Sequence, residues 1–232
     1  MSTIGKTLSA TFDTSAGHTI DDGTDAGRRR FLGGVGAAAI VSSTSLMRPA
    51  FAQSAKLKVG VLLPRSGVQA FFGQSCQFGA DVAPAVIKSL LGVDIELMNA
   101  DTESNVDTAR SRAERLISEG AQVLVGAFDS GASLAIAQVA EQKGVPFVIN
   151  IAAAPQITDQ GYKFTFRNFP TSVDLVVNGL GLARDLFLAT GTAPRTAVFM
   201  HVNDTFGQAN RAAIAAILPK LDYLPFKLLD TI

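Results

Sequence analysis

Cysteine and histidine are scarce in this chain of 232 residues, which contains only Cys76, His18 and His201. A single cysteine allows no disulfide within the chain and no zinc site built from thiolates. Two histidines are too few for an imidazole-rich metal centre. We therefore expect no metal and no other cofactor, an inert Cys76 and a structural role for His201.

An excess of charge of either sign is also missing, because 20 Lys and Arg residues balance 20 Asp and Glu residues. This balance gives no indication of nucleic acid or of an anionic membrane as a partner. The sequence also lacks a G-x-S-x-G motif and a phosphate loop ending in Gly-Lys-Ser/Thr. No residues in it have the spacing of a known metal-binding motif. We therefore expect that the protein is not an enzyme, although the composition, 47% hydrophobic and 17% charged, is that of a globular protein.

Residues 1–54 have the three parts of an export signal. A polar segment ends in a basic run, and the pattern formed by Arg28, Arg29, Phe31 and Leu32 resembles a twin-arginine leader. A moderately apolar stretch follows at residues 33–47. The small residues around Ala52 match a signal peptidase site, and we expect cleavage after Ala52.

Two other interpretations of this leader are weaker. A membrane anchor needs about 20 mostly apolar residues, and residues 33–47 are diluted by glycine, serine and threonine. Residues 34–39 also mimic the G-x-G-x-x-A fingerprint of dinucleotide-binding loops. No strand precedes them, so the context that gives the fingerprint its meaning is absent.

Residues 121–155 carry the clearest structural pattern of the chain. An apolar run at residues 121–128 predicts a buried strand, and residues 132–143 have the 3.6-residue spacing of a helix that packs on a sheet. A second apolar run at residues 145–150 predicts the next strand. Strand, helix and strand imply parallel pairing, in which small molecules bind beyond the carboxyl ends of the strands. Ser130 and Ser133 lie at that edge.

The same alternation of short apolar runs and amphipathic segments extends from residue 55 to the end of the chain. Pro84 should kink one of the helices or reset its first turn. The predicted helices are 73–91, 105–119, 132–143, 172–189 and 208–218, and the predicted strands are 57–63, 93–99, 121–128, 145–150, 161–167, 196–202 and 226–232. The last strand ends without a turn or cap, so we expect a fragment or a truncated product.

The order of several segments resembles that of the leucine/isoleucine/valine-binding proteins of ABC transporters, which are type I periplasmic solute-binding proteins. The matching segments are 59–67, 99–101, 126–133, 145–155, 164–170 and 203–207. The resemblance implies an α/β fold of two lobes, with parallel sheets flanked by helices, that closes on a small solute and docks on an ABC permease in the membrane. It places an N-terminal lobe at residues 55–170, and a crossover with an incomplete second lobe at residues 171–232.

Site residues follow from this resemblance by position. The serine-rich loop that holds a ligand carboxylate in the family corresponds to Ser130, Gly131, Ala132 and Ser133. The turn before a proline corresponds to Ala152 and Ala153, and the aromatic residue of the second lobe corresponds to Phe206. Ser66 and Phe72, near the end of the first strand, are weaker candidates.

Several positions depart from the family pattern. Gly131 and Ala132 stand where hydroxyl groups are common, the turn before Pro155 has only alanines, and Phe206 replaces a tyrosine. The acidic residue that meets the ligand's ammonium group in the family would lie beyond Ile232. The ligand is therefore expected to be an amino acid, or a more apolar or aromatic carboxylate or amide. A ligand-sensing receptor of the same fold, and a truncated chain that binds nothing, stay open as alternatives.

Overall fold

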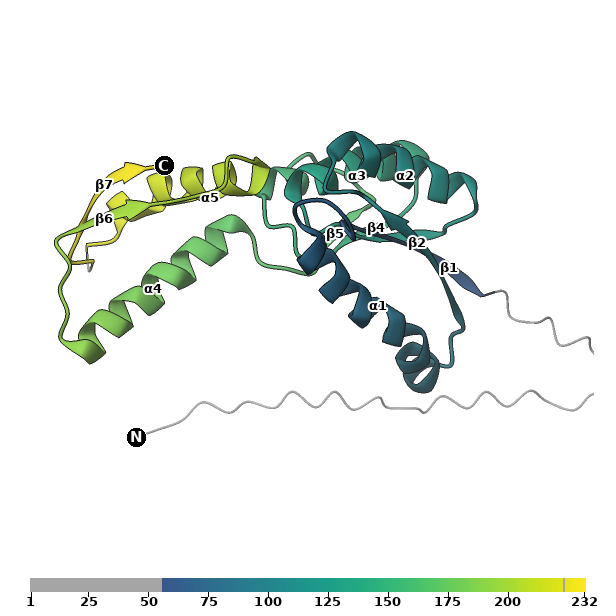
Figure 1. The fold of residues 1–232 in the computed structure, drawn as a ribbon, viewed down its shortest axis with the longest axis horizontal. Coiled ribbons are helices and arrows are strands. Elements are labelled where there is room, and N and C mark those ends of the chain that lie inside the picture. Colours follow the sequence, from purple (N-terminus) through teal and green to yellow (C-terminus); the bar gives the residue numbers. More distant parts are fainter. Residues whose placement is uncertain (1–55, 223) are drawn as a thin grey trace, which may run out of the picture. The chain divides into compact units, whose positions relative to one another are not determined.

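The computed structural model describes residues 56–222 and 224–232 (Figure 1). The predicted leader, with Arg28, Arg29, Phe31, Leu32 and cleavage after Ala52, lies outside the described residues and stays a prediction. No helix within the described ranges is long and apolar enough to cross a membrane.

A parallel sheet of five strands forms the larger layer. Its strand order is β2-β1-β3-β4-β5, and every neighbouring pair is parallel. The strands are β1 (Leu57–Leu63), β2 (Ile95–Asp101), β3 (Val123–Gly126), β4 (Phe147–Ile149) and β5 (Thr165–Arg167). The parallel pairing predicted from residues 121–155 is confirmed, and β5 lies at an edge of the sheet.

Helices cover both faces of this sheet, with α1 (Ala70–Leu91) on one face and α2 (Val106–Ser118) and α3 (Ser130–Lys143) on the other (Figure 1). Alternation along β1 explains this arrangement, because successive side chains of a strand point to opposite faces. Leu62 packs with Leu116 of α2 and Ile136 of α3, whereas Val61 belongs to the cluster that faces α1. The apolar residues with helical spacing in α3 are all buried, namely Ala132, Ala135, Ile136, Val139 and Ala140.

Residues 172–231 add a second, two-stranded parallel sheet and two long helices. The elements are α4 (Ser172–Thr190), β6 (Thr196–Phe199), α5 (Thr205–Ile217) and β7 (Lys227–Thr231). Val176 of α4 packs with Ala213 and Ile214 of α5. The two sheets thus lie on either side of residue 170 in the sequence, and the assignment of residues 55–170 and 171–232 to two lobes stays a prediction.

The α1 and α5 helices each begin three residues earlier than the sequence predicts. The α1 helix begins at Ala70 and is continuous through Pro84, because apolar residues on both sides of the proline, such as Ala80 and Ile87, face the sheet. The α5 helix begins at Thr205, because the side chain of Asp204 accepts a hydrogen bond from the Gly207 N–H and caps the helix there. Residues 205–207 are therefore the first turn of a helix and not a loop.

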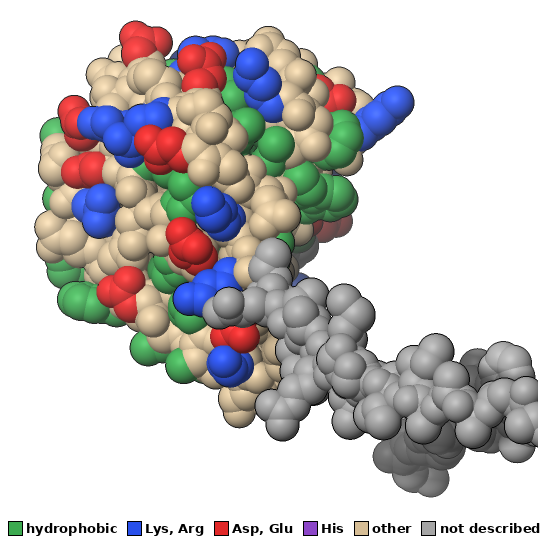
Figure 2. All heavy atoms as spheres, turned by 90° about the vertical axis from the view of Figure 1, so that its right-hand side faces the viewer, with side chains coloured by type: hydrophobic (Ala, Val, Ile, Leu, Met, Phe, Trp, Pro, Cys, Tyr) green, Lys and Arg blue, Asp and Glu red, His purple; other side chains and the backbone are tan. Residues whose placement is uncertain are grey.

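Charged side chains of both signs are mixed over the face of the molecule seen in Figure 2. Lys and Arg side chains alternate there with Asp and Glu side chains, and apolar side chains lie between them. This distribution agrees with the balanced composition of the sequence.

Candidate ligand site

A cavity of about 620 Å³ lies where segments that follow β1, β3, β4, β5 and β6 come together. These segments leave the carboxyl ends of parallel strands, which is where open α/β sheets bind small molecules. The lining residues are Val68, Gln69, Phe72, Phe128, Asp129, Ser130, Ile151, Ala152, Phe169, Leu175, Val202, Asp204 and Phe206.

The N-terminus of α3 forms one wall of the cavity. Asp129 is its N-cap, and the Asp129 carboxylate accepts a hydrogen bond of 2.6 Å from the Ala132 N–H. Ser130 lines the cavity, and its hydroxyl oxygen accepts a bond of 3.4 Å from the Ala154 N–H. The first N–H groups of a helix have no acceptor within the helix, so this end carries a partial positive charge that favours anionic groups.

Ser133 is oriented differently from Ser130. Both side chains are buried, but the Ser133 hydroxyl donates a hydrogen bond of 2.7 Å to the Ala127 carbonyl oxygen. Ser133 does not line the cavity. Its hydroxyl therefore ties α3 to the end of β3, which positions Ser130 one turn earlier.

Arg167, at the end of β5, holds the turn at residues 151–154. Its guanidinium donates hydrogen bonds to the carbonyl oxygens of Ala152 and Ala154, the latter at 2.7 Å, and to the Thr158 hydroxyl at 3.3 Å. Desolvation by partial burial lowers the pKa of Arg167 below its usual value. This bonding places Ala152 at the cavity, whereas Ala153 does not line it and its carbonyl oxygen accepts a bond from the Ser172 N–H.

Asp101, at the end of β2, fixes the loop between β1 and α1. One of its carboxylate oxygens accepts hydrogen bonds from the N–H groups of Arg65, Ser66 and Glu103, at 2.9, 3.2 and 2.8 Å. Desolvation acts to raise the pKa of Asp101, but these hydrogen bonds outweigh it and hold the pKa below its usual value. Ser66 serves this loop and does not line the cavity.

The start of α1 brings Phe72 to the cavity. A side-chain carbon at the next residue, Gly73, would lie 2.0 Å from the Pro64 carbonyl oxygen, so only glycine allows this close approach. The Gln69 side-chain amide donates a hydrogen bond of 3.0 Å to the Asp129 carboxylate. Phe72 then stacks on Phe128, with ring centroids 4.8 Å apart and planes 5° apart.

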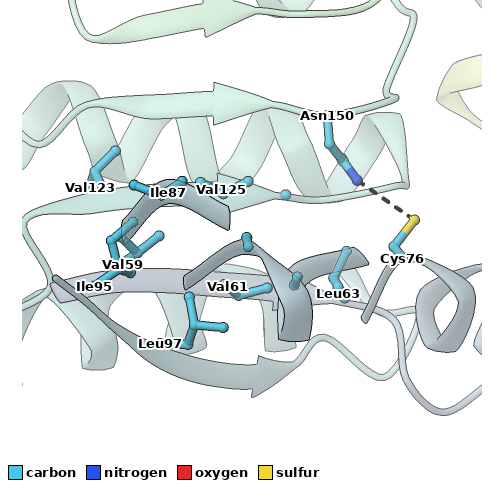
Figure 3. A pocket seen from close by; sticks show the side chains of 13 residues that line it. Val59, Val61, Leu63, Cys76, Ile87, Ile95, Leu97, Val123, Val125 and Asn150 are labelled. Carbon is cyan, nitrogen blue, oxygen red and sulfur yellow. Dashed lines mark hydrogen bonds between the residues drawn. The ribbon is translucent and has the colours of Figure 1, made fainter. Parts of the chain in front are cut away.

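A second cavity, of about 350 Å³, lies between α1 and the sheet (Figure 3). Its lining is almost wholly apolar, with side chains such as Val61 and Leu97 pointing into it. The Asn150 side-chain amide lies 3.8 Å from the Cys76 sulfur. Burial raises the pKa of the Cys76 thiol, which keeps it protonated and agrees with the expected lack of reactivity.

Of the residues suggested by the sequence, Ser130, Ala152, Phe72 and Phe206 line the larger cavity together. The others, which are Gly131, Ala132, Ser133, Ala153 and Ser66, do not line it. Sequence reasoning missed Gln69, Phe128, Asp129 and Phe169. The signal available for Asp129 was its position shortly before the helix predicted at residues 132–143, where aspartate is a common N-cap. The ligand-binding role of all these residues stays a prediction.

Three comparisons place this geometry among known proteins. A family model described as "Periplasmic binding protein" matches residues 56–223. A Leu/Ile/Val-binding protein homolog 8 from Brucella suis biovar 1 (strain 1330) is 31% identical over 168 residues, which are 67% of this chain and 41% of that protein.

Solved structures show the same fold. A leucine-binding protein from Thermotoga maritima MSB8 is 28% identical, with a TM-score of 0.62, over 75% of this chain and 48% of that one. A solute-binding protein from R. palustris, solved with 4-hydroxybenzoate, is 23% identical, with a TM-score of 0.62, over 76% of this chain and 46% of that one. The α/β fold with parallel sheets and flanking helices, expected from the sequence, is thereby confirmed. The chain spans less than half the length of these proteins.

Proposed function

Because the chain belongs to the periplasmic binding protein family, we propose that it is the substrate-binding component of an ABC transporter. Its ligand is an amino acid or a related small carboxylate or amide, held in the 620 Å³ cavity. A relative is named for Leu/Ile/Val binding and a structural neighbour for leucine binding, and both names support this ligand class. The chain binds and delivers its ligand without converting it.

The convergence of two capped helix N-termini on one cavity carries this proposal. Asp129 caps α3 and Asp204 caps α5, and both caps line the cavity together with Ser130. Donor groups at a helix N-terminus bind carboxylates, and hydrogen bonds to a charged group contribute about 1.5–3 kcal/mol each. In this assignment Ser130 contacts the polar end of the ligand, and Phe72, Ala152 and Phe206 contact its apolar part.

Delivery to a membrane permease requires a location outside the cytoplasm. The family is one of periplasmic binding proteins, and the leader pattern at Arg28 and Arg29 suggests export by the twin-arginine route. Cell fractionation of the chain with Arg28→Lys and Arg29→Lys tests this route. Retention of the variant in the cytoplasm supports it, and unchanged export contradicts it.

A thermal-shift screen of the purified chain tests ligand binding. Amino acids, short amides and aromatic acids are titrated, and a true ligand should stabilise the chain by RT ln(1 + [L]/Kd), which is about 2.7 kcal/mol at 100 times Kd. The Ser130→Ala variant should need more ligand for the same shift, whereas Ser118→Ala, whose hydroxyl bonds the Arg115 carbonyl of α2, should respond as wild type does. If no solute at millimolar concentration stabilises the chain, the proposed function is wrong.

A further inference from the structure

We propose that the cavity selects ligands with a planar aromatic ring, and that the Phe72 and Phe128 pair is the surface on which this ring is recognised. The proposal rests on the proposed function and names the substrate class of the same site. It predicts aromatic acids, aromatic amino acids or aromatic amides as ligands, in preference to branched aliphatic ones of equal size.

Four phenylalanine side chains from four separate segments line the cavity, namely Phe72, Phe128, Phe169 and Phe206. Phe72 lies in the first turn of α1, Phe128 follows β3, Phe169 follows β5 and Phe206 lies in the first turn of α5. Two of these rings are open to water, because Phe72 is 49% exposed and Phe206 is 40% exposed. Apolar surface of this extent, gathered in a cavity, is typical of a ligand contact.

The orientation of Phe72 is fixed before a ligand arrives. Its ring stacks in parallel on Phe128, and the Phe71 ring meets it nearly at a right angle, with centroids 5.5 Å apart. Parallel offset and edge-to-face contacts are the two arrangements that the charge distribution of aromatic rings favours. A flat ring can extend this cluster in the same geometries, whereas a saturated ring or a branched chain gains only from the burial of apolar area.

The charged lining residues distinguish this proposal from cation binding. Asp129 and Asp204 line the cavity, and together with aromatic rings two carboxylates would suit a quaternary ammonium ligand. Both carboxylates are already engaged, since each accepts the hydrogen bond that caps its helix, and Asp129 also accepts one from Gln69. The helix N-termini offset part of their negative charge. The geometry therefore favours stacking of a ring over capture of a cation.

Matched pairs of ligands that differ only in the ring test the proposal. Calorimetric titration of the 232-residue chain compares benzoate with cyclohexanecarboxylate, and phenylalanine with cyclohexylalanine, with choline as the cationic probe. We expect the aromatic member of at least one pair to bind about threefold to tenfold more tightly, as aromatic pairs gain beyond area burial.

Variants of the lining phenylalanines test whether the preference for aromatic ligands comes from the stacked Phe72 and Phe128 rings. Phe72→Leu should lower the ratio of the affinity for the aromatic ligand to the affinity for its cyclohexyl counterpart toward one. Phe206→Leu changes another ring of the cavity, and tests the same ratio if Phe72→Leu is poorly folded. Phe78→Leu is the matched control, because Phe78 lies on the same helix, is 73% exposed and does not line the cavity. The control should keep the wild-type ratio.

Three outcomes overturn the proposal. Equal affinities within each pair show that the cavity does not recognise a planar ring. Tighter binding of choline than of any aromatic acid shows a cation site instead. Binding of no solute at all contradicts the proposed function itself, and is distinguishable from the first two outcomes because they require measurable binding.

Discussion

A side-chain carbon placed on Gly131 would lie 3.2 Å from the hydroxyl oxygen of Thr205. Gly131 belongs to the first turn of α3 and Thr205 to the first turn of α5, so the two helix N-termini touch beside the cavity. The same carbon would lie 3.2 Å from the Val106 side chain. Glycine at this position therefore lets the segments on either side of the cavity approach each other.

Substitution of Gly131 should separate these helix ends. We expect Gly131→Val to lower the free energy of unfolding by about 1–3 kcal/mol and to weaken ligand binding, because an overpacked contact forces its neighbours to move. Chemical denaturation and calorimetry measure the two effects. Gly179→Ala in α4 is the control, since that position is open, and the loss of a helical glycine should stabilise by about 0.5–1 kcal/mol. A Gly131→Val chain that binds and unfolds as wild type does would contradict the contact.

The two serines at the start of α3 should differ in their effect on ligand binding. Ser130→Ala should raise the Kd of a ligand by about tenfold, as expected for the loss of one hydrogen bond to a charged group. Ser133→Ala removes the hydroxyl that bonds the Ala127 carbonyl, so it should lower the free energy of unfolding by about 1–2 kcal/mol and raise Kd less than Ser130→Ala does. If Ser133→Ala raised Kd more than Ser130→Ala did, the two roles would be reversed.

Repeated patterns explain how much of this could be predicted from the sequence. The apolar run of β1 and the 3.6-residue spacing of apolar positions in α2 and α3 are local signals, and the elements they predicted agree with the structure within a few residues. The cavity is different, because Phe128, Phe169 and Phe206 are far apart in the sequence and meet only through the crossover connections. A phenylalanine beside a predicted helix gives no local sign of which cavity it faces. Arg167 was missed for the same reason, since its partners are carbonyl groups 13 and 15 residues earlier.

Arg167 should be required for the shape of the cavity. Arg167→Met leaves the buried Ala152 carbonyl without a donor, and the loss should cost about 1–3 kcal/mol of stability. The Ala154 carbonyl loses the Arg167 bond but keeps the one of 3.3 Å from the Ile157 N–H. Arg167→Lys should rescue only part of this loss, because an ammonium group lacks the planar fork that reaches both oxygens. Arg211→Met is the control, because Arg211 bonds the Thr231 hydroxyl at the surface and should change stability by less than about 0.5 kcal/mol. Denaturation by urea measures all three variants, and equal losses for Met and Lys would contradict the role of the fork.

Stability should depend on the ionisation of Asp101 in acid. Its pKa is lower in the folded chain than in an unfolded one, where aspartate titrates near about 3.9, so the unfolded chain binds the proton first as pH falls. The contribution of Asp101 is therefore complete above about pH 4 and is lost as pH falls through the lower, folded value. The Asp101→Asn variant should be less stable than wild type at pH 7, because a neutral amide oxygen is a weaker acceptor for the N–H groups of Arg65, Ser66 and Glu103.

The difference between wild type and Asp101→Asn is the quantity that tests this ionisation. It should be constant from pH 7 to about pH 5 and shrink below about pH 4, with a slope of at most one proton. Urea denaturation at each pH measures it. Because the loop held by Asp101 leads into Gln69 and Phe72, the variant should also bind ligand less tightly at pH 7. A stability difference that stayed unchanged down to pH 3 would show that the three N–H groups do not depend on the charge of this carboxylate.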